Sequence, residues 1–248
     1  MTLAPRWFIF EEVPHHPSGL VGIILSAKVL MLRAAVIIDY QNVHLTGVDL
    51  FAAQRDPRSN PLNPLLFATN LIAERNSRIT DTRILASLTR VEVYRGLPSS
   101  VHDPRDNASN LEQQRLWTQD NRVTVTHRPL KYAGTKNPAT SQGSRGYLTK
   151  TEKGIDVLCA LAVVRNTQSP LIDLVIMASH DSDLEPAIEG AVRLSDRTKI
   201  ETASWFNPKV KQGWVRMNPH TPQPIWNNRL GKSVMESSTD KVPGLFSR

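Results

Sequence analysis

Two short apolar runs, each followed by acidic residues, constrain the fold of this chain more than any other feature. Residues 34–39 read AAVIID and close on Asp39, and residues 174–179 read LVIMAS and lead into Asp181. Continuous apolar runs of this kind are typical of parallel strands that are buried on both faces. Segments with helical spacing lie between the strands. The alternation therefore predicts an α/β fold, a Rossmannoid parallel sheet with helices on both faces.

The remaining elements follow from periodicity and from turn residues. Expected strands lie at 83–95, 123–127, 172–178 and 199–204, and expected helices at 62–76, 107–120, 151–167 and 183–195. Thr149 and Glu152 are placed to form a capping box for the helix at 151. Residues 128–148 lack periodicity and predict a long loop, and proline and polar residues from 207 onward predict an irregular tail.

The composition of the chain indicates which kinds of partner and compartment to expect. The net charge of +7 and the pI near 9.8 favour an anionic partner, with nucleic acid ahead of a membrane surface. The single cysteine, Cys159, excludes an internal disulfide and a cysteine-based zinc site, which suits a reducing cytoplasm. The apolar stretch at 20–32 is too short to span a membrane and contains Lys28. We interpret 1–30 as a disordered extension, with a weak export signal as the alternative.

Carboxylates follow the predicted strands and open one predicted helix: Asp39, Asp156, Asp181 and Asp183. In an open α/β sheet such positions converge at the carboxyl ends of the strands. Carboxylates that share a crevice repel one another unless a hard cation lies between them, so the set predicts a Mg²⁺ or Mn²⁺ site. Taken singly, each has a plain structural alternative. Asp39 fits a turn, Asp156 fits a solvated helix face, and Asp183 fits the start of a helix capped by Ser182.

Three motifs in order resemble those of NYN domains, the LabA/DUF88-like branch of the PIN-like nucleases. They are Ile38-Asp39-Tyr40-Gln41-Asn42, Lys153-Gly154-Ile155-Asp156-Val157 and Ala178-Ser179-His180-Asp181-Ser182-Asp183-Leu184. The resemblance spans roughly 33–205. It implies a metal-dependent ribonuclease in which Asp39, Asp156, Asp181 and Asp183 surround Mg²⁺ or Mn²⁺, and in which Asn42 orients a carboxylate or a phosphate.

The chain departs from the family pattern at two positions. His180 replaces the usual glycine, either to contact a phosphate or as a side chain tolerated in the turn. Ala162 stands where many members carry a further acid. Glu152 lies one turn before Asp156 in the expected helix, so it is a candidate substitute for that acid, besides its role in the capping box.

A strip of basic residues precedes the Asp156 helix and suits the phosphates of a polyanion without reading its sequence. The candidate RNA-binding residues in it are Arg128, Lys131, Lys136, Arg145 and Lys150. The structural alternative is a solvated loop that binds nothing. Cations and tryptophans also alternate in the tail, including Trp205, Trp214 and Trp226, where either stacking on single strands or packing onto the domain fits.

Together these features predict a nuclease domain at 31–206, a disordered extension before it and a basic, proline-rich tail at 207–248. The expected function is a metal-dependent endoribonuclease of the cytoplasm that acts on RNA, has no membrane contact and is compatible with a homodimer. The alternative is a catalytically weak RNA-binding or regulatory module. A nucleotide-binding protein of Rossmann type lacks support, because neither glycine-rich phosphate motif is present.

Overall fold

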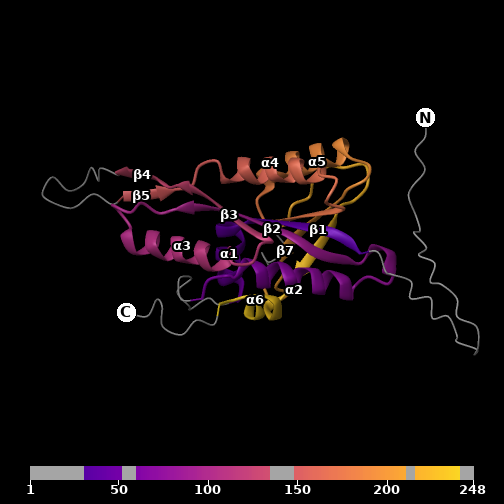
Figure 1. Cartoon of the computed structure of the whole chain (residues 1–248), viewed down its shortest axis with the longest axis horizontal. Coiled ribbons are helices and arrows are strands. Elements are labelled where there is room, and N and C mark those ends of the chain that lie inside the picture. The colour runs from indigo at the N-terminus through magenta and orange to yellow at the C-terminus, as the bar shows by residue number, and fades with distance from the viewer. Residues whose placement is uncertain (1–30, 52–59, 135–147, 211–215, 241–248) are drawn as a thin grey trace, which may run out of the picture.

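A computed structural model describes residues 31–51, 60–134, 148–210 and 216–240, and a parallel six-stranded sheet lies at its centre (Figure 1). The strand order is β3-β2-β1-β6-β7-β8, and every neighbouring pair is parallel. The strands are β1 (Leu32–Asp39), β2 (Ala86–Leu97), β3 (Val123–Pro129), β6 (Leu174–Ala178), β7 (Lys199–Trp205) and β8 (Trp226–Leu230). The predicted α/β class is confirmed.

Helices cover both faces of the sheet, as Figure 1 shows. One face carries α1 (Tyr40–Phe51), α2 (Pro64–Ser77), α3 (Pro104–Trp117) and α6 (Lys232–Ser237). The other carries α4 (Ile155–Thr167) and α5 (Glu185–Leu194). Alternate residues of β1 enter the two cores, with Val36 and Ile38 on the α1 side and Ala35 and Ile37 on the α4 side. This accounts for the unbroken apolar run in the sequence.

The order of the strands reverses between β1 and β6. From β1 the chain builds outward to β2 and β3, and it then returns to the other side of β1 to place β6, β7 and β8. Connections on the two sides of such a point leave in opposite directions, and open α/β sheets bind their ligands in the crevice expected there, at the carboxyl ends of the two strands. Asp39 ends β1 and Ser179 follows β6, so both lie at this position.

Two segments that were expected to be irregular contain strands. The expected loop at 128–148 begins and ends in an antiparallel hairpin of β4 (Lys131–Gly134) and β5 (Leu148–Thr151), while residues 135–147 lie outside the described part. The tail expected from 207 contains β8 and α6, so the sheet extends past the boundary expected at 206. The sequence pattern did not predict β8, because its side chains are mostly polar. An edge strand needs apolar residues only where it faces a core.

The capping box expected at Thr149 and Glu152 is wrong. The hydroxyl of Thr149 donates to the carbonyl of Ala133 across the hairpin, and α4 begins only at Ile155. Gly154 precedes it with φ of 75°, a left-handed conformation that a glycine adopts without strain. The turn at Gly154 frees the side chain of Glu152 for a tertiary contact.

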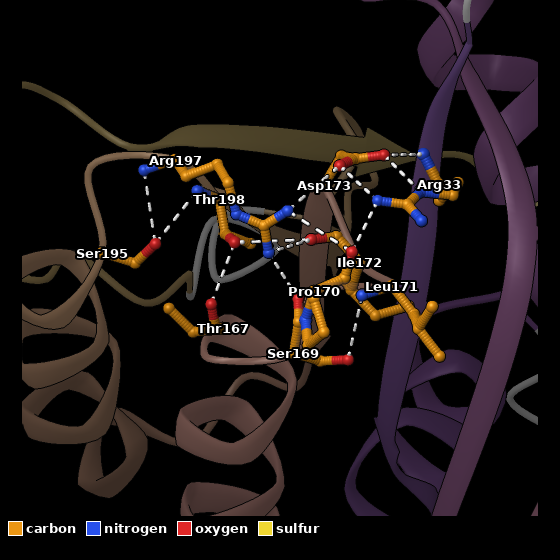
Figure 2. Close-up of polar contacts among 10 residues, drawn as sticks. All are labelled: Arg33, Thr167, Ser169, Pro170, Leu171, Ile172, Asp173, Ser195, Arg197 and Thr198. Carbon is orange, nitrogen blue, oxygen red and sulfur yellow. Dashed lines mark hydrogen bonds and ion pairs between the residues drawn. The ribbon is translucent and has the colours of Figure 1, made fainter. Parts of the chain in front are cut away.

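A polar network ties the strands together at their amino ends, away from the crevice (Figure 2). The guanidinium of Arg33 in β1 donates to both carboxylate oxygens of Asp173, at 2.8 and 2.9 Å. Arg197 donates to carbonyls of the segment before β6, and the hydroxyl of Thr198 donates to the carbonyl of Thr167 at the end of α4. The charged groups of Arg33, Asp173 and Arg197 at this end therefore all bind protein partners.

A buried ion pair joins α2 to β7. The Arg75 side chain is 1% exposed, and its Nη2 lies 2.8 Å from Oε1 of Glu201. Asn228 of β8 donates to the other oxygen of the same carboxylate, at 2.9 Å.

Within the described ranges, no helix is long and apolar enough to cross a membrane.

Candidate active site at the carboxyl edge of the sheet

Asp39 is the most buried of the predicted acids. It ends β1 with 6% of its surface exposed. Its Oδ2 accepts a hydrogen bond from the hydroxyl of Ser179, at 3.0 Å, and the oxygen of that hydroxyl accepts from the backbone N–H of Asp181, also at 3.0 Å. Ser179 is fully buried and therefore links the two aspartates directly across the switch point.

Burial raises the pKa of Asp39 to about 6. The hydrogen bond from Ser179 opposes this rise, while the negative charges of Glu152 and Asp181 add to it. The ionised form of the Asp39 carboxylate is disfavoured, because burial removes its water and neighbouring anions repel it. A cation at the crevice would relieve that cost.

Glu152 reaches the same edge from the opposite side of β1. Its Oε1 accepts from the backbone N–H of Gly96 at 2.5 Å, and the side-chain oxygen of Gln41 lies 3.3 Å from the same N–H. A Cβ on Gly96 would lie 2.5 Å from that Glu152 oxygen and 2.3 Å from Cδ2 of Leu130. The glycine therefore leaves the space that Glu152 occupies. From the sequence, Gly96 was notable only because it directly follows the strand expected at 83–95.

Asn42 lies in the first turn of α1 and faces the end of β6. Its Oδ1 accepts from the backbone N–H of His180, at 2.8 Å, and lies 3.3 Å from Nδ1 of the same residue. The backbone N–H of Asn42 also lowers the pKa of Asp39 by a hydrogen bond to its carboxylate. Asn42 is thus placed beside Asp39, where the motif resemblance expects it.

Asp183 and Asp156 are less closely engaged. Asp181 accepts from the backbone N–H of Asp183 at 2.9 Å and thereby caps the 3₁₀ turn η3 (Ser182–Leu184), so Asp181 takes the capping role expected of Ser182. The side chain of Asp183 is exposed. Asp156 is half-buried in the first turn of α4 and, within the described ranges, its carboxylate has no hydrogen bond or ion pair.

Asp156 and Asp39 both lie close enough to Cys159 for their charges to act on it. The pKa of Cys159, one turn further along α4, is raised by burial and then by the charges of Asp39, Asp156 and Glu152. The position where family members carry a further acid is Ala162, which is fully buried against the sheet. A carboxylate there would be desolvated, so the apolar residue suits this core.

The carboxylate oxygens at this edge of the sheet suit a hard divalent cation that takes few ligands from the protein. Among the described residues, no three His, Cys, Asp or Glu side chains are close enough to hold an ion together. Mg²⁺ commonly takes only one or two carboxylates and keeps water and substrate phosphate at its other positions. Asp39 and Asp181 would supply those two carboxylates, and Ser179 joins the carboxylate of Asp39 to the backbone N–H of Asp181.

The predicted basic strip is only partly described. Arg128 of β3 packs beside the start of α4, since a Cβ on Gly154 would lie 3.4 Å from its Cζ. Lys131 is exposed on β4. Lys150 of β5 is paired, with Nζ 3.3 and 3.4 Å from carboxylate oxygens of Asp103 and Asp106. Lys136 and Arg145 lie outside the described residues.

The aromatic residues expected in the tail divide into packed and exposed groups. Trp205, at 2% exposure, packs edge-on against Phe51 and Phe67, and its indole N–H donates to the carbonyl of Val43. Trp226 on the outer strand β8 is 49% exposed. Trp214 lies outside the described residues. Packing is therefore the role of Trp205.

No family model and no curated protein matches the sequence. Among solved structures, the chain is similar to a protein of unknown function from Vibrio parahaemolyticus. The two are 16% identical with a TM-score of 0.37, over 69% of this chain and 80% of that chain. We therefore argue the function from the carboxyl edge of the sheet and from the sequence motifs alone.

Proposed function

We propose that this protein is a metal-dependent ribonuclease that uses Mg²⁺ or Mn²⁺ at the carboxyl edge of its sheet. The observation that carries the proposal is the buried Asp39, with its pKa raised to about 6, linked through Ser179 to Asp181 at the switch point. A buried carboxylate with a perturbed pKa at such a position is a candidate functional residue.

Each residue then has a role that follows from its surroundings. Asp39 and Asp181 hold the cation, and the exposed Asp183 and half-buried Asp156 contribute negative charge around its water shell. Asn42 donates to an anionic oxygen of the substrate. A bound cation would polarise the scissile phosphate and lower the pKa of a coordinated water. Arg128 and Lys131 hold the backbone that approaches from the hairpin side.

The choice of RNA comes from the three motifs that resemble those of NYN domains, and phosphoester chemistry comes from the carboxylates. The basic net charge agrees with a polyanionic substrate. With one cysteine, which is buried in the core, the chain suits a reducing compartment, and we place the enzyme in the cytoplasm.

One observation favours a second candidate, an RNA-binding module with weak or no turnover. Within the described part of the chain, fewer than three ligating side chains converge on one point, and His180 fills the place of a glycine. Such a module would bind RNA through the same hairpin and would need no metal.

Cleavage of a labelled RNA pool separates the two. We expect products with Mn²⁺ or Mg²⁺ and none with EDTA, and we expect Asp39→Asn to lower the rate by orders of magnitude. Asp49→Asn is the matched control, because Asp49 is an exposed acid on the same helix α1. Binding without cleavage under every metal condition favours the module. Equal rates for Asp39→Asn and Asp49→Asn exclude the proposed site.

A further inference from the structure

His180 contacts two other elements through its ring, and the contact with β7 fixes its tautomer. The backbone N–H of Trp205 lies 2.9 Å from Nε2 of His180. A backbone N–H is a donor only, so Nε2 must be the acceptor and therefore the unprotonated nitrogen of a neutral ring. The proton then lies on Nδ1.

The protonated nitrogen faces Asn42. Nδ1 lies 3.3 Å from Oδ1 of Asn42, and the backbone N–H of His180 donates to the same oxygen at 2.8 Å. Both groups are donors, so the atom that receives them must be the oxygen of the carboxamide and not its nitrogen. The NH₂ group of Asn42 is therefore turned away from His180.

That NH₂ group has no acceptor among the described residues, and Asn42 is half-buried beside Asp39. A fixed, two-proton donor without a protein partner at the edge of a crevice suits an anionic oxygen. We propose that His180 is a positioning residue, which holds Asn42 so that its NH₂ group donates to a phosphoryl oxygen of the substrate. This inference rests on the proposed function for the identity of the substrate.

A plain structural role for His180 would be to hold the end of β7 alone. The two roles use different ring nitrogens, and two substitutions separate them. In His180→Asn the amide nitrogen takes the place of Nδ1 and keeps the contact with Asn42, whereas in His180→Gln the amide oxygen takes the place of Nε2 and keeps the contact with Trp205. Both replacements are polar and smaller than, or close to, the ring in volume.

The kinetic arm compares these variants with Asn42→Ala on a short RNA. We expect Asn42→Ala to lower kcat by about 10²-fold, near the cost of removing one preorganised donor. His180→Gln should also lower kcat, with little change in KM. His180→Asn should retain most of the wild-type kcat. Asn42→Ala should show no further loss on adding His180→Gln, because the two residues act as one unit. A rate for His180→Gln equal to or above that of His180→Asn overturns the inference.

The spectroscopic arm does not depend on turnover. A long-range ¹H–¹⁵N spectrum of the imidazoles should show His180 protonated at Nδ1, and saturating adenosine 5′-monophosphate should shift the side-chain NH₂ signals of Asn42. His180→Gln should reduce that shift. An Nε2-protonated ring, or NH₂ signals that stay in place, overturns the inference. If the shifts occur while no metal condition gives RNA cleavage, the anion site stands and the ribonuclease proposal fails.

Discussion

The hydroxyl of Ser179 donates to the carboxylate of Asp39, and this single 3.0 Å contact joins residues 140 positions apart in the chain. It connects the carboxyl ends of the two strands between which the order of the sheet reverses. Asp39 thereby gains one hydrogen bond but no positive charge.

The stability of the protein without metal should depend on the charge of Asp39. Its pKa is raised from 3.8 to about 6, so the folded state binds this proton more tightly than the unfolded state does. The cost of ionisation is then fully present above about pH 6 and is relieved as the pH falls towards about 4. A pKa difference of this size corresponds to on the order of 3 kcal/mol. Urea unfolding in EDTA should show Asp39→Asn more stable than the wild type at pH 8, with a smaller difference at pH 5. Parallel pH profiles for the two proteins would contradict this account.

Gly96→Ala should destabilise the protein and displace Glu152. The added Cβ would lie 2.3 Å from Leu130 and 2.5 Å from Glu152, so the side chains or β2 must shift, at a cost of about 1–3 kcal/mol. Gly190→Ala is the control. Gly190 lies in α5 with open space around it, and alanine should stabilise the helix by about 0.5–1 kcal/mol. Thermal unfolding of both variants tests the pair, and a neutral Gly96→Ala would show that Glu152 is not held at this position.

Lys131→Ala should weaken RNA binding more than Lys150→Ala. Lys131 is exposed on β4, whereas the ammonium of Lys150 is paired with Asp103 and Asp106. A lost phosphate contact should reduce the salt dependence of single-strand binding by about 0.7 in slope. Binding isotherms of an uncleavable RNA at several salt concentrations measure both variants. Equal salt slopes for the two variants would show that Lys131 makes no phosphate contact that Lys150 lacks. RNA would then contact another part of the protein.

Arg75→Met should cost about 3–5 kcal/mol of unfolding free energy, because it leaves the Glu201 carboxylate buried without its cation. The double change Arg75→Met with Glu201→Gln should recover a large part of that loss, since an amide carries no charge to desolvate. Denaturant unfolding gives both values. An equal loss in the single and the double variant would mean that packing, and not the ion pair, sets the effect.

The sequence predicted the parts of the site that depend only on strand ends. Asp39 and Asp181 follow apolar runs, and the carboxyl ends of neighbouring parallel strands meet at one edge, so their proximity was predictable. The contact between the backbone N–H of Gly96 and the side chain of Glu152 was not predictable, because it depends on the pairing of β2 and on the left-handed turn at Gly154. Local patterns favoured a capping box at Glu152, and a tertiary hydrogen bond prevailed over it.

The outer strand β8 was hidden for a different reason. Its sequence WNNRL carries few apolar residues, and its asparagines pair with partners from β7, such as Asn228 with Glu201 and Asn227 with Ser204. Polar residues of this kind predict a tail when read alone. Only the neighbouring strand supplies the groups that make them strand residues.

Strand β8 follows the other described strands along the chain. Residues 226–230 cover the edge of β7 and complete the hydrogen bonds of Glu201. Before they dock, β7 presents an unpaired edge, and Asp240, which binds both Asn63 and the indole of Trp117, has not yet joined α2 to α3. Contacts over such separations form slowly, and uncovered strand edges recruit other chains. We therefore expect that, before this segment docks during synthesis, the edge of β7 is open to chaperones and to other chains.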